Sequence, residues 1–297
     1  MPSNRVIGLD LGGTKILAGV VDRDGVVERH KETPTPLDSQ AELLDGLDAA
    51  VSELLDDGIV ALGLGIPSRI DQRTGRIEGS VNIPLEGLDF RTRMSDRFDL
   101  PVGIENDANA AALAEHRAGA GRGADTMAML TLGTGVGGGV VIDGELYRGW
   151  AEFGHIVIVL DGEPCQGSCT GHGHLESYVS GTAATRRAQA SFGEAVDAHR
   201  LVRIAEEGDR EAIEILADIG RHLGAGIGSI VNIFDPEVVV VGGGFAAAGD
   251  LLLEPAREVM RREALAPASE RVRVVRAELG TMAGLIGAGL VGFEAPT

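Results

Sequence analysis

Two glycine-rich turns in this sequence follow apolar, strand-like runs and could bind phosphate. They are Gly12-Gly13-Thr14, which lies between Asp10 and Lys15, and Gly133-Thr134-Gly135. Glycine in a tight hairpin lets backbone N–H groups converge on an anion, and the two threonines add hydroxyl donors. One such turn would most simply be a hairpin without a ligand, but two turns in matching positions favour phosphate binding. Asp10, at the end of its strand, could hold Mg²⁺ directly or through water.

These turns do not follow the better-known nucleotide loops. Neither has the spacing of a Walker loop or of the Rossmann fingerprint. A third cluster, Gly242-Gly243-Gly244, follows the valine run Val238–Val241 and precedes a helix that we expect to begin near Ala247. A strand, a glycine turn and a helix in succession are the usual setting for nucleotide contact at the carboxyl edge of a sheet.

Histidine and cysteine residues cluster in one short segment, as His155, Cys165, Cys169, His172 and His174. Thiolate and imidazole groups at this density are the usual ligands of a tetrahedral structural Zn²⁺ site. A disulfide is disfavoured in a cytoplasmic chain. The segment therefore predicts bound zinc, with either His172 or His174 as the fourth ligand.

Asp107 lies at a predicted junction between a strand, Pro101–Glu105, and an alanine-rich helix expected from about Asn109 to Ala118. The N-terminus of a helix favours the ionised form of a carboxylate. Phosphoryl transfer to a hydroxyl needs one carboxylate that takes the proton as the new P–O bond forms. Asp107 could instead serve only as the helix N-cap, and the residue by itself leaves both interpretations open.

Strands and helices alternate over most of the chain and must position these residues. We expect strands at 5–10, 15–22, 60–66, 101–105, 126–132, 138–142, 238–241 and 271–277, and helices at 41–55, 109–118, 209–234 and 282–293. A strand that ends in a glycine-rich hairpin occurs twice, which predicts two related α/β domains facing each other over a cleft. With a boundary at Gly119–Gly123, we expect a small domain over 1–118, completed by the terminal helix 282–297, and a large domain over 119–281.

The net charge of −19 over 297 residues limits the partners of the protein. Nucleic acid or an anionic membrane would need a basic surface, so neither is an expected partner. The apolar stretch 283–293 is too short to span a bilayer, and the first residues lead directly into a strand without a secretory segment. We therefore expect a cytoplasmic protein.

Six motifs occur in order over almost the whole chain. They are Asp10-Leu-Gly-Gly-Thr-Lys15, Glu105-Asn-Asp-Ala-Asn109, Leu132-Gly-Thr-Gly-Val-Gly-Gly-Gly139, Glu152-Phe-Gly-His155, Leu175-Glu176 and Gly242-Gly-Gly244. Together they resemble the ROK sugar kinases, which have the actin-like ATPase (ribonuclease H-like) fold, and among these most of all the bacterial glucokinases. The resemblance implies a glycolytic enzyme that uses ATP and Mg²⁺ to phosphorylate the 6-hydroxyl of glucose.

The resemblance also implies roles for the matching residues. Asp107 would be the catalytic base, and Asn106 beside it would bind a sugar hydroxyl. The further sugar contacts would be Asn82, Glu152, His155 and Glu176, whose amide, carboxylate and imidazole groups suit hydroxyl recognition. The nucleotide contacts would be Asp10, Gly12, Gly13, Thr14, Lys15, Gly133, Thr134, Gly135, Gly243 and Gly244.

The histidine and cysteine segment departs from the usual family pattern, Cys-x-Cys-Gly-x₂-Gly-Cys-x-Glu. Counted back from Glu176, the last cysteine is replaced by His174, and the first lies further out, at Cys165. Histidine can take the place of cysteine at zinc, so the alignment favours His174 over His172. The zinc ligands would then be His155, Cys165, Cys169 and His174, with the second ring nitrogen of His155 left for the sugar.

Several alternatives stay open at this point. The pocket residues are shared among hexose kinases, so the substrate could be fructose, mannose or an N-acetylated hexosamine, and the donor could be polyphosphate. Relatives also include sugar-sensing regulators with an N-terminal helix-turn-helix domain, which an acidic chain that begins at its first strand does not favour. Asp10, Asp107 and both phosphate turns disfavour a sugar-binding regulator without catalysis. A homodimer or higher homo-oligomer is expected, and relatives suggest a dimer built on the larger domain.

Overall fold

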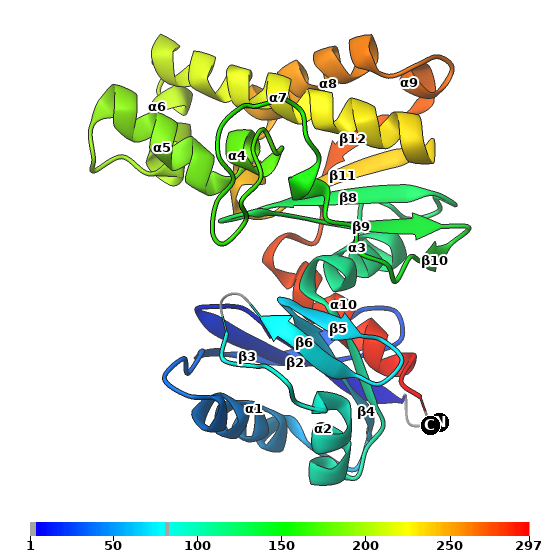
Figure 1. Ribbon diagram of the computed structural model, residues 1–297. Helices are drawn as coiled ribbons and strands as arrows, with labels where there is room; N and C mark the ends of the chain where they lie inside the picture. The colour runs from blue at the N-terminus through cyan, green and yellow to red at the C-terminus, as the bar shows by residue number, and fades with distance from the viewer. Residues whose placement is uncertain (1–3, 81–82, 297) are drawn as a thin grey trace. The chain divides into compact units, whose positions relative to one another are not determined.

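The computed structural model describes residues 4–80 and 83–296, which fall into two compact units (Figure 1). The first unit is built from residues up to Arg122 and from Thr281 onward, and the second is the continuous segment from Gly123 to Gly280. The boundary between them lies inside the glycine-rich segment Gly119–Gly123. Both ends of the sequence thus contribute to one unit.

Five strands form the sheet of the first unit. They are β1 (Arg5–Leu11), β2 (Lys15–Val21), β3 (Val27–Pro34), β4 (Ile59–Ile66) and β7 (Val102–Asn106). Their order is β3-β2-β1-β4-β7, in which β1, β2 and β3 are antiparallel neighbours and β4 and β7 run parallel to β1. A separate hairpin of β5 (Ser68–Asp71) and β6 (Arg76–Ser80), which the sequence did not predict, follows β4.

Helices pack on both faces of this sheet (Figure 1). They are α1 (Gln40–Leu54), α2 (Phe90–Phe98), α3 (Asp107–Ala118) and α10 (Ala283–Phe293). Side chains alternate along β1, so Ile7 and Leu9 are fully buried in the core shared with α1 and α2. Gly8 and Asp10 consequently lie on the opposite face, which α10 covers.

Glycines on three adjacent strands let α10 lie close to the sheet. A Cβ on Gly8, Gly63 or Gly103 would lie 2.6, 1.8 or 2.2 Å from a carbonyl oxygen of α10. No side chain fits into such a gap, because carbon and oxygen atoms in a close-packed interior need more than 3 Å. These glycines account for part of the unusually high glycine content, and they keep Asp10 beneath the first turn of α10.

The second unit contains a sheet of the same design. Its strands are β8 (Met127–Leu132), β9 (Val136–Ile142), β10 (Glu145–Leu146), β11 (Val238–Gly242) and β12 (Arg273–Arg276). The order β10-β9-β8-β11-β12 again combines three antiparallel strands with two that run parallel to the first. The two units therefore repeat one topology, in keeping with the repeated strand and glycine hairpin of the sequence.

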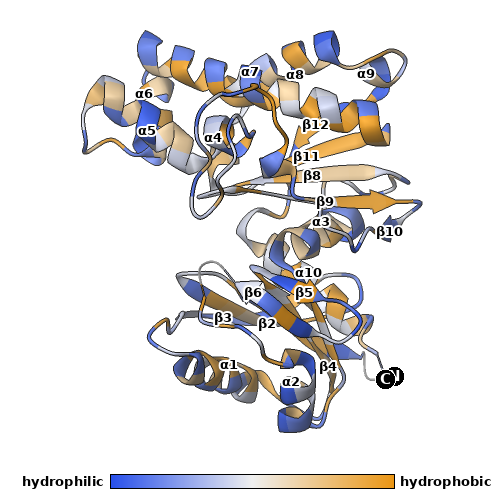
Figure 2. Ribbon diagram, viewed as in Figure 1, coloured by the Kyte–Doolittle hydropathy of each residue, from blue (hydrophilic) through white to orange (hydrophobic). Residues whose placement is uncertain are grey.

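The helices of the second unit bury the central strands of its sheet. They are α4 (Glu176–Val179), α5 (Gly181–Phe192), α6 (Ala198–Glu206), α7 (Arg210–Phe234), α8 (Asp250–Glu263) and α9 (Ala268–Arg271), with short 3₁₀ turns at Phe153–His155 and Gly244–Ala248. A third 3₁₀ turn, Gly280–Met282, crosses the boundary into the first unit. Leu216, Leu223 and Ile230 of α7 are fully buried in a core with strand β11. Figure 2 shows the hydrophobic colouring of β11. Within residues 4–80 and 83–296, no helix has the length and apolar character needed to cross a membrane.

The segment after the third glycine cluster differs from the prediction. A helix was expected to begin near Ala247, whereas the chain forms a 3₁₀ turn over Gly244–Ala248 and begins α8 at Asp250. Gly249 separates the two with φ 58° and ψ −135°, a conformation that favours glycine and interrupts a helix.

Candidate active site

Asp107 is the first residue of α3, and the N-cap is its neighbour Asn106. Asn106 Oδ1 accepts the N–H groups of Ala108 at 3.0 Å and Asn109 at 3.3 Å. The helix thus begins two residues earlier than the sequence predicted, and the interpretation of Asp107 as the N-cap is wrong. Its Oδ1 accepts the N–H of Ala108 at 2.9 Å, and the helix N-terminus stabilises its negative charge.

A buried carboxylate fixes this strand-to-helix junction. Glu105, the residue before Asn106, is 1% exposed. Its Oε1 accepts hydrogen bonds from Gln72 Nε2 at 2.9 Å, from the Asn106 N–H at 2.9 Å and from Asn109 Nδ2 at 3.1 Å. The junction that carries Asn106 and Asp107 is therefore held from three sides.

Asp10 lies close enough to Asp107 for the two charges to interact. Burial, and then the charge of Asp107, raise the pKa of Asp10 to about 6, while Lys15 opposes this shift. A Cβ on Gly284 would lie 2.3 Å from Asp10 Oδ2, so the first turn of α10 has room only for glycine beside this carboxylate. Two neighbouring carboxylates with little solvent around one of them are suited to a bound cation. Lys15 Nζ itself forms an ion pair with Glu32 at 2.7 Å.

The raised pKa of Asp10 has a consequence for stability. The folded state binds the Asp10 proton more tightly than the unfolded state does. Ionisation of Asp10 therefore lowers the free energy of unfolding: the full loss is present above about pH 6, and there is no loss below pH 3.8. In metal-free buffer, Asp10→Asn is therefore expected to raise the free energy of unfolding at pH 8 by up to about 3 kcal/mol. Urea unfolding at pH 8 and pH 4 measures this. The gain should vanish at pH 4, and a loss of stability at pH 8 would contradict it.

The first glycine hairpin has its carbonyl groups tied back to the chain that follows β3. Thr35 Oγ1 donates to the Gly12 carbonyl at 2.7 Å, and the Thr35 N–H donates to the Thr14 carbonyl at 3.1 Å. The Gly12 carbonyl and the Gly13 N–H belong to one trans peptide, so they point in opposite directions. The Gly13 N–H therefore points away from Thr35.

The second hairpin repeats this arrangement at the N-terminus of α5. The Gly181 N–H donates to the Gly133 carbonyl at 2.7 Å, and Thr182 Oγ1 donates to the Thr134 carbonyl at 2.8 Å. The N–H groups of Thr134 and Gly135 therefore point away from α5. Both hairpins can offer backbone donors to an anion.

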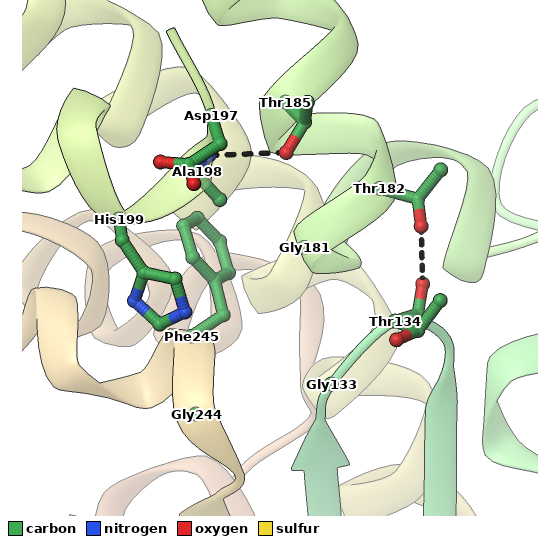
Figure 3. Close-up of a pocket in the computed structure, with 10 residues that line it drawn as sticks. All are labelled: Gly133, Thr134, Gly181, Thr182, Thr185, Asp197, Ala198, His199, Gly244 and Phe245. Atoms are coloured by element: carbon green, nitrogen blue, oxygen red, sulfur yellow. Dashed lines mark hydrogen bonds between the residues drawn. The ribbon is translucent and has the colours of Figure 1, made fainter. Parts of the chain in front are cut away.

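A pocket of about 350 Å³ adjoins this second hairpin (Figure 3). Gly133 and Thr134 line one side of it, and Gly244 and Phe245 line another, with the His199 ring beside Phe245. Gly243, just before, has φ 85°, and a Cβ there would lie 2.4 Å from the Leu132 carbonyl oxygen. Only glycine fits this position, which keeps the third glycine cluster directly against the start of the hairpin.

The structure brings together four of the predicted metal ligands, His155, Cys165, Cys169 and His174, with ligand atoms all within 4.8 Å of one another. The two Nδ1 atoms are 3.2 Å apart, and both the Cys165 Sγ–His155 Nδ1 and Cys169 Sγ–His174 Nδ1 distances are 3.7 Å. A tetrahedral Zn²⁺ site would give N–N and N–S separations of about 3.3 and about 3.6 Å. The donor set and its spacing therefore fit zinc. His172 is exposed and is not a member of this cluster.

Glu176 connects the cluster to the second hairpin. Its Oε2 accepts the Val136 N–H at 2.8 Å, and Cys165 Sγ lies 3.9 Å from its Oε1. Glu152 is exposed, directly before the 3₁₀ turn that carries His155. Asn82, the other predicted sugar contact, lies outside the residues that the structure describes.

A family model described as "ROK family" matches residues 6–292. The chain belongs to the ROK family. Its two-domain fold is accordingly that of the actin-like ATPases. The glucokinase of Streptomyces coelicolor is 36% identical to this ROK protein, over 95% of each chain. The N-acetyl-D-glucosamine kinase of Escherichia coli is 31% identical, over 95% of this chain and 97% of that kinase.

A solved ROK structure agrees with these sequence relatives. The glucokinase of Streptomyces griseus, in complex with glucose and AMPPNP, superposes with a TM-score of 0.84. It is 36% identical, and the match covers 98% of this ROK protein and all of that chain.

Seven residues that line this pocket were not singled out from the sequence. They are Gly181, Thr182, Thr185, Asp197, Ala198, His199 and Phe245. Phe245 directly follows the third glycine cluster and could have been included with it. Thr182 lies on α5 and His199 on α6, and only the packing of these helices brings them to the second hairpin. No local sequence pattern therefore identifies them as pocket residues.

Proposed function

We propose that this ROK protein is a glucokinase, which transfers the terminal phosphoryl group of ATP to the 6-hydroxyl of glucose. The observation that carries the proposal is the repeated glycine hairpin. In each hairpin the carbonyl groups accept hydrogen bonds from a neighbouring segment, so the backbone N–H groups point the other way and can bind phosphate oxygens. The identity of 36% with glucokinases along nearly the whole chain supports the choice of substrate.

In this proposal Asp107 is the general base. Its carboxylate takes the proton of the 6-hydroxyl as the oxygen attacks phosphorus, and the helix N-terminus favours the charged form of this carboxylate. Asn106 offers its Nδ2 to a sugar hydroxyl, because its Oδ1 already caps the helix. The network around Glu105 holds both side chains in position, which reduces the cost of orienting the sugar.

The second unit supplies the remaining sugar contacts in this proposal. Glu152 and Glu176 accept hydrogen bonds from ring hydroxyls. His155 contributes its Nε2, because its Nδ1 belongs to the metal cluster. The backbone donors at Thr134 and Gly135 then hold phosphate oxygens of ATP.

Two metal ions belong to the proposal. A Mg²⁺ near Asp10 would neutralise charge on the ATP phosphates. A structural Zn²⁺ would be held by His155, Cys165, Cys169 and His174, whose atoms have the spacing of a tetrahedral site.

An N-acetylhexosamine kinase is the second candidate, because one relative of 31% identity has that activity. Initial rates with glucose, fructose, mannose and N-acetylglucosamine, each with ATP and Mg²⁺, separate the two. We expect kcat/KM to be highest for glucose, by about tenfold or more. A higher value for N-acetylglucosamine would transfer the assignment to the second candidate. Absence of ADP release with every sugar would contradict a kinase and favour a regulator.

A further inference from the structure

One side chain links the metal cluster to the second glycine hairpin. Gln166 directly follows the cluster residue Cys165, and its Nε2 donates to the Thr134 carbonyl at 3.3 Å and to Ser180 Oγ at 3.1 Å. The two N–H groups of one amide thus serve two acceptors. One of these acceptors belongs to the hairpin that the proposed function assigns to phosphate binding.

The Thr134 carbonyl determines where the next N–H points. Gln166 Nε2 and Thr182 Oγ1 both donate to it, the latter at 2.8 Å (Figure 3). Because the peptide between Thr134 and Gly135 is planar, a fixed carbonyl also fixes the Gly135 N–H on the opposite side. Gln166 therefore helps to hold a donor that a phosphate oxygen would use.

The backbone that carries Gln166 has little packing of its own. Gly167 and Ser168, the next two residues, are exposed, and Gly167 has φ 64°. The Cys165 N–H donates to the Gly171 carbonyl at 2.9 Å, but the segment ends in Cys169, which is again a cluster member. A metal ion that binds both cysteines would fix both ends of this short turn and so restrict Gln166.

We propose that Gln166 is a positioning residue for nucleotide binding, through which metal occupancy of the cluster sets the affinity for ATP. The inference rests on the proposed kinase function and adds a second role for the cluster, on the phosphate side of the reaction. A purely structural role for Gln166 is the competing explanation, because Ser180 Oγ also caps α5 by accepting the Ala183 N–H at 3.1 Å. That role would alter stability and leave nucleotide affinity unchanged.

The first test compares Gln166→Leu with Gln189→Leu in the metal-loaded protein. Gln189 lies on α5, is exposed, and donates one comparable hydrogen bond to the Glu194 carbonyl at 3.2 Å. Calorimetric titration with AMPPNP measures nucleotide affinity without turnover. Loss of one positioning hydrogen bond should weaken AMPPNP binding about three- to tenfold in Gln166→Leu and less than about twofold in Gln189→Leu. Glucose affinity should be unchanged in both variants.

The second test adds removal of the metal with a chelator. The native protein should lose AMPPNP affinity, whereas Gln166→Leu should lose little more, because the link is already broken. An equal loss in both proteins, or AMPPNP binding by metal-loaded Gln166→Leu within about twofold of native, would overturn the proposal. If chelation unfolds the protein, the AMPPNP affinities of the two metal-loaded variants still show whether Gln166 positions the nucleotide. Because neither test needs sugar turnover, a failure of glucose phosphorylation would be seen separately.

Discussion

Asp107→Asn is expected to lower kcat for glucose phosphorylation by about 10²- to 10⁴-fold, the usual contribution of a general base. Glucose affinity should stay within about twofold, because the amide keeps the size of the side chain and can still accept the Ala108 N–H. An ADP-release assay measures the rate, and calorimetry measures glucose binding. The same substitution should also lower the pKa of Asp10, since the charge of Asp107 raises it.

Asp143→Asn is the matched control for this experiment. Asp143 is an exposed turn residue in the second unit with φ 53°, a conformation that asparagine tolerates well. Its replacement should leave kcat unchanged. Turnover by Asp107→Asn within about tenfold of the native protein would contradict the assignment of Asp107 as the base.

His174→Ala is expected to abolish stoichiometric zinc binding. The substitution removes one of the two Nδ1 ligands and leaves three donors, so metal affinity should fall by at least about 100-fold. Elemental analysis of the purified protein measures zinc per chain, and thermal unfolding should show a lower midpoint. Glucose affinity should fall too, because His155 is held by the same cluster.

His172→Ala is the control, because this histidine lies in the same segment but is exposed and outside the cluster. It should retain one zinc per chain and native unfolding behaviour. Loss of zinc in His172→Ala with retention in His174→Ala would show that the ligand assignment is wrong.

Features set by short-range patterns could be predicted from the sequence. Glycine turns after apolar runs marked both hairpins, and the density of cysteine and histidine marked the metal cluster. The helix start at Asp107 was placed two residues late, because the sequence does not show that Asn106 Oδ1 would cap it. The 3₁₀ turn before α8 was missed for a similar local reason, the conformation of Gly249.

Contacts between distant segments could not be predicted. Gln166 reaches the Thr134 carbonyl across 32 positions of the chain, and nothing in the sequence around it signals that bond. His199 likewise reaches the pocket only because α6 packs beside α5. The unpredicted hairpin of β5 and β6 supports the site as well, since Gln72, in the turn between its strands, donates to Glu105.

The position of α10 in the first unit has a consequence for biosynthesis. Residues 123–280 form a continuous unit and can fold as soon as they leave the ribosome, whereas the sheet that carries Asp10 lacks the helix over one of its faces until residue 293 has been added. The strands of the first unit are thus synthesised first, but their sheet is covered by α10 only at the end. Throughout synthesis of the second unit, Gly8, Gly63 and Gly103 present a surface without side chains, and a nascent chain in this state is exposed to mispairing until α10 covers this face.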